Sequence, residues 1–275
     1  MLGKLLKYEL KASGRMLLPI YGAVLVMGVI SSLFLRTAPD MNWDNTIMTV
    51  LTMVSIILFF GLIFAALCLS LVVSILRFKK NLLGEEGYLM NTLPVSTWQN
   101  IVAKAIVAVL YQIISLIVAV FAGFSFTMVG ANVSFVEIFG SVIDAFREIL
   151  SQMGGVFWLY AVEILVIMLI STFGSNMMIY ASMSVGHSMN SHKVVSSVAV
   201  FLGFYIVSQI INSFLLAGGA YFYALAGSYS LSELYRPQPA ILAILVLEIA
   251  YLTAYFFITK YFLSLIHISA PTRPY

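Results

Sequence analysis

Long apolar runs separated by short polar stretches form the dominant pattern of this chain. Six runs are long enough to cross a bilayer, because a membrane-spanning helix needs about 20 apolar residues for roughly 30 Å of hydrocarbon. They lie at residues 17–35, 47–76, 101–130, 155–183, 195–226 and 239–262. The pattern therefore predicts an all-α membrane protein with six transmembrane helices. The second run is longer than a perpendicular helix needs, which favours a stalk that continues beyond the membrane.

Two further stretches show one apolar and one polar face. In residues 1–16 the leucines share one helical stripe and the lysines another, which predicts an interfacial elbow helix on the inner leaflet. At about residues 135–152 apolar side chains repeat at helical spacing while charged side chains mostly fill the other face. We expect a second amphipathic helix there, on the outer side.

Composition agrees with a lipid environment. The chain is 62% hydrophobic and 9% charged, whereas roughly a quarter of the residues of a soluble domain are charged. The net charge of +3 comes from basic residues at the ends of apolar runs rather than in a patch, which argues against a nucleic-acid partner. The single cysteine, Cys68, excludes an internal disulfide and a cysteine-based metal cluster.

The distribution of lysine and arginine predicts the orientation, because cytoplasmic loops carry the excess. Ten basic residues fall on the side of the termini and three on the other. The ten are Lys4, Lys7, Lys11, Arg15, Arg77, Lys79, Lys80, Lys104, Lys193 and Lys260, and the three are Arg36, Arg147 and Arg236. Both termini are therefore predicted to be cytoplasmic.

The last stretch, "LSLIHISAPTRPY" at residues 263–275, is set apart from the rest. It closely resembles the in-frame translation of a transposase-library sequencing adapter, and we interpret it as an assembly artefact. His267 and Arg273 are accordingly given no role, and Arg273 is left out of the charge comparison.

No catalytic, cofactor-binding or metal-binding motif occurs in the chain. His187 and His192 are five residues apart, so they do not share a helical face as a metal pair would. We therefore expect no enzymatic activity and no resident cofactor, and any ATP would be bound and hydrolysed by a partner subunit.

Two acidic residues, Glu163 and Glu248, lie inside predicted spans, each roughly eight to ten residues from the outer end. A carboxyl group at such depth marks a functional candidate, because it is costly unless paired, protonated or hydrated. We expect both at similar depth, serving either a translocation path or helix packing. The polar side chains expected near them are Asn176, Gln209, Asn212 or a tyrosine.

The loop at residues 77–100 is the longest polar interruption in the first half of the chain. Pro94 and a capping box from Ser96 to Gln99 predict the start of the third span. Before them there is room for a short helix, with Glu85 and Glu86 at its N-terminal end. It carries the apolar side chains Tyr88, Leu89, Met90 and Leu93. These favour docking into a groove of a partner, and the alternative is an interfacial helix that returns them to the inner leaflet.

The string "RFKKNLLGEEGYLMNTLPVS", the stretch "LGKLLKYELKASGR" and the six spans resemble the permeases of ABC-2-type ABC transporters of Gram-positive bacteria. The resemblance implies that residues 17–262 are the permease domain of a bacterial cell-membrane exporter. It also implies that the loop carries a coupling helix that seats in a separate nucleotide-binding subunit, and that a second permease copy or paralogue completes the path. The residues that take the coupling role by resemblance are Glu85, Glu86, Tyr88, Leu89, Met90 and Leu93.

Two other functions stay open at this point. A proton-coupled secondary transporter would use Glu163 and Glu248, and a non-transporting scaffold or sensor subunit would need no path of its own. The sequence names no substrate.

Overall fold

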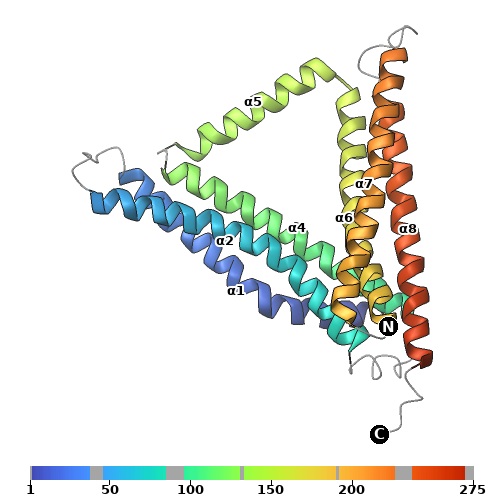
Figure 1. Cartoon of the computed structure of the whole chain (residues 1–275). Helices are drawn as coiled ribbons and strands as arrows, with labels where there is room; N and C mark the ends of the chain where they lie inside the picture. The colour runs from blue at the N-terminus through green and yellow to red at the C-terminus, as the bar shows by residue number, and fades with distance from the viewer. Residues whose placement is uncertain are drawn as a thin grey trace. The chain divides into compact units, whose positions relative to one another are not determined.

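The computed structural model describes residues 2–37, 46–84, 96–130, 133–189, 192–226 and 237–269. Within these ranges the regular elements are all helical (Figure 1). They are α1 (Leu2–Thr37), α2 (Thr46–Phe78), η2 (Lys79–Leu83), α4 (Thr97–Gly130), α5 (Phe135–Met153), α6 (Val156–Ser188), α7 (Lys193–Ala226) and α8 (Gln238–Ser269). All but α5 and the short η2 are long and apolar enough to cross a membrane, which gives six candidate spans among the described residues. The predicted fold class is confirmed.

The second span is longer than a bilayer requires. It covers Ile47–Leu83, or 37 residues, which corresponds to about 55 Å at 1.5 Å per residue. Its last turn is the π-helix η2, which widens the backbone after Phe78. The helix therefore continues into the polar loop, as the length of the apolar run predicted.

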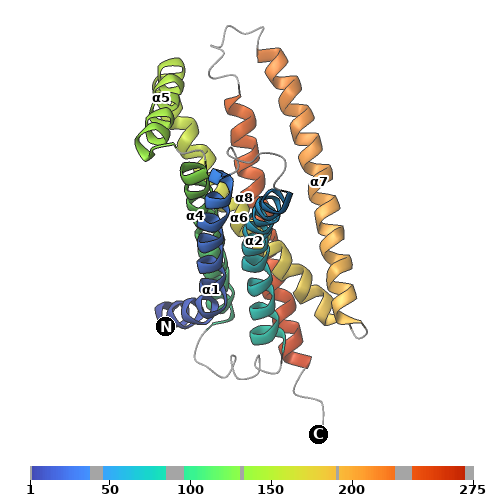
Figure 2. The ribbon, with the colours of Figure 1, turned by 90° about the vertical axis from the view of Figure 1, so that its left-hand side faces the viewer.

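Helix α1 is continuous from Leu2 to Thr37 but bends near its N-terminal end (Figure 2). Pro19 lies inside the helix, and a proline there lacks the N–H of a helical hydrogen bond and presses on the carbonyl of Arg15. The amphipathic first turns thus leave the apolar part at an angle. Their position on the inner leaflet stays a prediction.

The chain divides into two compact units. Unit 1 comprises residues 1–74 and 106–149, and unit 2 comprises residues 75–105 and 150–275, so α2 and α4 contribute to both. The core of unit 1 includes the fully buried side chains Leu17, Val24, Phe59 and Ala122.

Hydrogen bonds between helices add to this apolar core in unit 1. The Tyr21 hydroxyl lies 2.7 Å from Oγ of Ser115, and Tyr111 Oη donates to the carbonyl of Leu10 at 2.7 Å. Buried polar groups in a helical membrane protein require such partners, because lipid offers none.

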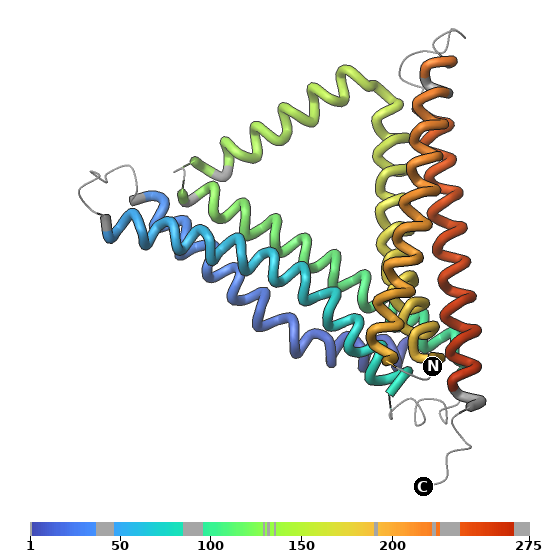
Figure 3. The backbone as a smooth tube through the Cα atoms, in the orientation of Figure 1, coloured from blue at the N-terminus to red at the C-terminus, as the bar shows by residue number. Residues whose placement is uncertain are grey.

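In unit 2, α6 packs against both α8 and α7 (Figure 3). The core here joins the end of α2 to α6, where Phe78 and Tyr180 stack with ring centroids 4.0 Å apart. Figure 2 shows that the end of α6 and the start of α7 lie close together and that the two helices diverge from there.

Helix α5 covers the stretch that the pattern predicted as amphipathic. Ser134 and Glu137 cap its start reciprocally: Glu137 Oε2 accepts from the Ser134 N–H at 3.0 Å, and Ser134 Oγ accepts from the Glu137 N–H at 3.3 Å. Two N–H groups that the helix leaves free are thereby satisfied.

Helix α8 runs past the predicted end of the sixth span to Ser269. Leu263 is fully buried in the core of unit 2. The helix continues because residues 263–266 are mostly apolar, and its course does not bear on the origin of this segment.

Candidate functional site

The predicted coupling residues lie outside the described residues. They are Glu85, Glu86, Tyr88, Leu89, Met90 and Leu93. The structure does describe the two ends of the loop, which show how its segment is attached.

Both ends of the loop belong to the same core cluster of unit 2. On the preceding side Phe78 and Leu82 are 0% and 1% exposed, and on the following side Ile101 is 0% exposed. The cluster also includes Tyr180 of α6 and Tyr255 of α8. The described residues that flank the loop are therefore held in the core of unit 2 on both sides.

The third span begins at Thr97, where the capping box predicted it. The carbonyl of Ser96 accepts from the N–H groups of Gln99 and Asn100 at 2.9 and 3.4 Å. The predicted side-chain bonds of Ser96 and Gln99 do not form among the described residues, so only the position of the helix start is confirmed.

Glu163 on α6 is paired with Gln238, the first residue of α8. The Gln238 amide donates from Nε2 to Glu163 Oε1. Glu163 Oε2 and Gln238 Oε1 are both buried and find no partner among the described residues. Both atoms are hydrogen-bond acceptors, so this buried contact has fewer donors than acceptors among the described residues.

Glu248 on α8 faces another part of α6. Its carboxyl hydrogen-bonds to Ser171, and a Cβ at Gly174 would lie 3.8 Å from Oε2. Ser171 is eight residues from Glu163, which separates the two sites by about 12 Å along α6. The expectation of similar depth is wrong, because Glu163 pairs with the first residue of α8 while Glu248 lies ten residues further along.

Near Glu248, Tyr251 of the same helix makes polar contacts with Asn212 and Ser208 of α7. Tyr251 Oη lies 3.4 Å from Oδ1 of Asn212 and 3.3 Å from the carbonyl of Ser208. Asn212 and Glu248 line one hollow of about 410 Å³ between α7 and α8, whose other lining is mostly apolar. The structure thus brings two of the predicted residues to one place.

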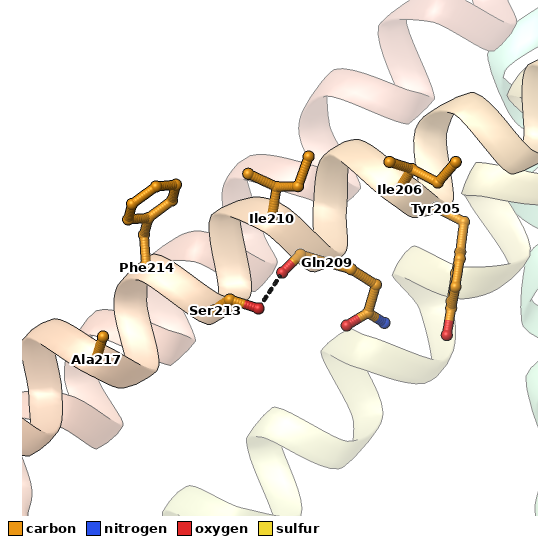
Figure 4. A pocket seen from close by; sticks show the side chains of 7 residues that line it. All are labelled: Tyr205, Ile206, Gln209, Ile210, Ser213, Phe214 and Ala217. Atoms are coloured by element: carbon orange, nitrogen blue, oxygen red, sulfur yellow. Dashed lines mark hydrogen bonds between the residues drawn. The ribbon is translucent and has the colours of Figure 1, made fainter.

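Asn176 and Gln209 lie elsewhere. Asn176 is 1% exposed and donates from Nδ2 to the Thr172 carbonyl of its own helix at 2.8 Å, which fits a packing role. Gln209 is exposed on α7, where it lines a shallow hollow with Tyr205 and Ser213. Figure 4 shows Tyr205 and Gln209 pointing to the same side of α7.

The sequence pattern did not predict the burial of two ionisable residues. Glu9 of unit 1 is 6% exposed and Lys104 of unit 2 is 5% exposed. Glu9 follows Leu5 and Leu6 at spacings of four and three, so it shares the leucine stripe of its helix. Lys104 likewise falls three residues after the buried Ile101. Helical spacing, rather than charge, was the signal that could have found them.

No three His, Cys, Asp or Glu side chains gather into a possible metal site in the part of the chain that the structure describes. No family model, no curated protein and no solved structure matches this chain. Fold and composition define the class: this is a helical multi-pass membrane protein.

Proposed function

We propose that the chain is the membrane subunit of an ATP-driven exporter of the ABC-2 type, coupled to a separate nucleotide-binding subunit. The attachment of the loop carries this proposal. The described residues on its two sides, Leu82 and Ile101, lie in one core cluster with α6 and α8, so a partner that docks on the loop would act next to these spans.

The connection is mechanical. A partner that moves the segment displaces Phe78, whose ring is stacked on Tyr180 of α6. Closely packed interiors transmit displacement rather than absorb it. A partner's ATP cycle would thereby alter the packing of α6 against α7 and α8, with Glu248 and Asn212 beside the hollow between α7 and α8.

Charge reversal in the loop tests the coupling role. We expect the double change Glu85→Lys and Glu86→Lys, and separately Leu89→Arg, to abolish co-purification with the co-expressed ATPase encoded nearest the gene. Insertion into the membrane should be unchanged. Asp144→Lys is the matched control, because Asp144 is an exposed acid of α5. Normal co-purification of the loop variants would refute the coupling role.

A proton-coupled carrier is a second candidate, and the orphaned oxygens of Glu163 and Gln238 favour it. An ionisable side chain inside a membrane span marks a candidate ion or proton path. Movement of an amphipathic fluorescent reporter in vesicles that lack the ATPase and nucleotide would support this candidate. Strict dependence on ATP would exclude it. ATP hydrolysis with no substrate movement would instead indicate a scaffold or sensor.

A further inference from the structure

A hollow of about 350 Å³ opens between the end of α2, the end of α6 and the start of α7. It is distinct from the hollow beside Glu248, whose lining comes from α7, α8 and Pro237. Its buried side is formed by Ser182, Met183 and Ser197. Its rim includes Leu76 and Val198, which are 52% and 54% exposed.

The α6–α7 contact at this end is unusually close. A Cβ at Gly186 would lie 2.4 Å from the backbone N and 2.5 Å from Cα of Ser197, so only glycine permits this approach. The backbones of α6 and α7 therefore meet beside Ser197, which lines the hollow.

The hollow is apolar at one end and basic at the other. Ile179 and Phe201 belong to its apolar wall, whereas Lys79 and His187 line the opposite end. Ile179 and His187 are eight residues apart on α6, so the two ends are separated by about 12 Å. His187 Nδ1 lies 2.9 Å from the carbonyl of Met183, which holds the ring in place.

Charge accumulates at the basic end. Lys79 lines this end, and Lys193 begins α7 one residue before Val194, which also lines the hollow. Among the described residues, the lining contains no carboxylate and neither lysine has a carboxylate partner. An occupant of this hollow should therefore carry a negative group and an apolar chain.

We propose that this hollow binds one anionic phospholipid, with its phosphate between Lys79 and Lys193 and an acyl chain along Ile179 and Phe201. A phospholipid fits better than a free anion because the hollow opens on exposed apolar side chains of spanning helices, where acyl chains lie. Basic pockets between membrane helices are a known arrangement for acidic headgroups.

Native mass spectrometry of the full chain titrated with phosphatidylglycerol tests this proposal, with phosphatidylcholine in parallel. We expect preferential binding of phosphatidylglycerol, reduced about fivefold by Lys79→Gln and by Lys193→Gln, and more by both together. The matched control is Lys260→Gln, which removes an exposed lysine of α8, a helix that does not line the hollow. It should leave binding unchanged.

Val198→Trp gives a second, charge-neutral test, because the larger side chain fills the hollow. It should lower binding of phosphatidylglycerol while the purified variant stays monodisperse. Equal binding of the two lipids, or equal losses for Lys79→Gln and Lys260→Gln, would overturn the proposal. Loss of binding on addition of soluble glycerol phosphate would instead indicate a site for the free anion and would also overturn it.

Discussion

The contact between Glu163 and Gln238 leaves buried hydrogen-bond acceptors without a donor among the described residues. One amide donor and three acceptor positions meet in a buried place, and two oxygens are left unsatisfied among the described residues. Buried polar atoms without partners are costly.

Two substitutions test this contact at the residue scale. Glu163→Gln should unfold at the wild-type temperature, because an amide on each side satisfies both groups. Gln238→Leu removes the only partner of Glu163 among the described residues and should cost about 1–3 kcal/mol. The temperature at which the monodisperse size-exclusion peak is lost in detergent measures the stability of both variants. A wild-type midpoint for Gln238→Leu would contradict this account.

Gly186 offers a second prediction at this scale. A methyl group there meets the backbone of Ser197, so Gly186→Ala should separate α6 from α7 and cost about 1–3 kcal/mol. A Cβ added to Gly203 on α7 would have no other side chain or backbone atom within 4 Å among the described residues. Gly203→Ala should therefore be neutral or slightly stabilising. The same thermal assay compares the two variants, and equal midpoints would show that the close contact is not required.

Among the elements, α2 is the one that the proposed coupling role tests most directly, since its last turns lie in the core of unit 2 just before the loop. Phe78→Ala leaves a cavity beside Tyr180 and should cost about 3–5 kcal/mol. Phe64→Ala removes a ring from the same helix that is 69% exposed, so it should cost far less. Thermal unfolding midpoints of the two variants, measured in the same detergent, compare these losses of stability. Similar losses for the two variants would mean that the Phe78–Tyr180 stack does not anchor the helix.

The elements were largely predictable because lipid imposes a simple rule: long apolar runs become helices. Five of the six predicted runs lie wholly within helices, the fourth begins one residue before α6, and α2 extends to its polar end as expected. The continuation of the first helix through Arg15 and Pro19 was not predicted, because the polar and apolar parts were treated as separate elements. Hydropathy describes the environment of a segment and does not report whether a bend interrupts the helix.

The candidate site was less predictable because depth and pairing depend on which helices touch. Counting residues from span ends placed Glu163 and Glu248 at one level, whereas pairing with Gln238 and Ser171 separates them. Burial of Glu9 and Lys104 was missed for the same reason. Charge patterns predict which side of the membrane a loop occupies but not which charged side chains enter a core.

At the scale of the whole molecule, α7 presents a polar stripe on an exposed face. Tyr205, Gln209 and Ser213 form a polar stripe at four-residue spacing on an exposed face. Polar side chains on a lipid-facing helix commonly bond to another helix. We propose that the stripe contacts the second permease copy or paralogue that an ABC-2 exporter requires.

Gln209→Leu should then weaken self-association about threefold, the size expected for one interhelical hydrogen bond in a membrane. Energy transfer between labelled copies in lipid vesicles measures this change. Thr253→Val is the control, because the exposed Thr253 hydroxyl bonds to the Ile249 carbonyl of its own helix. An unchanged dimer fraction for Gln209→Leu, or an equal loss for both variants, would exclude the stripe as the contact.

The central claim is that residues 85–93 dock on a nucleotide-binding subunit. Photo-crosslinking tests it most directly, with a photoreactive phenylalanine in place of Tyr88 and, as control, in place of Tyr221, which is 69% exposed on α7. Our account predicts that position 88 captures an ATP-binding-cassette subunit in intact membranes and that position 221 does not. Capture from both positions alike, or from neither, would contradict it.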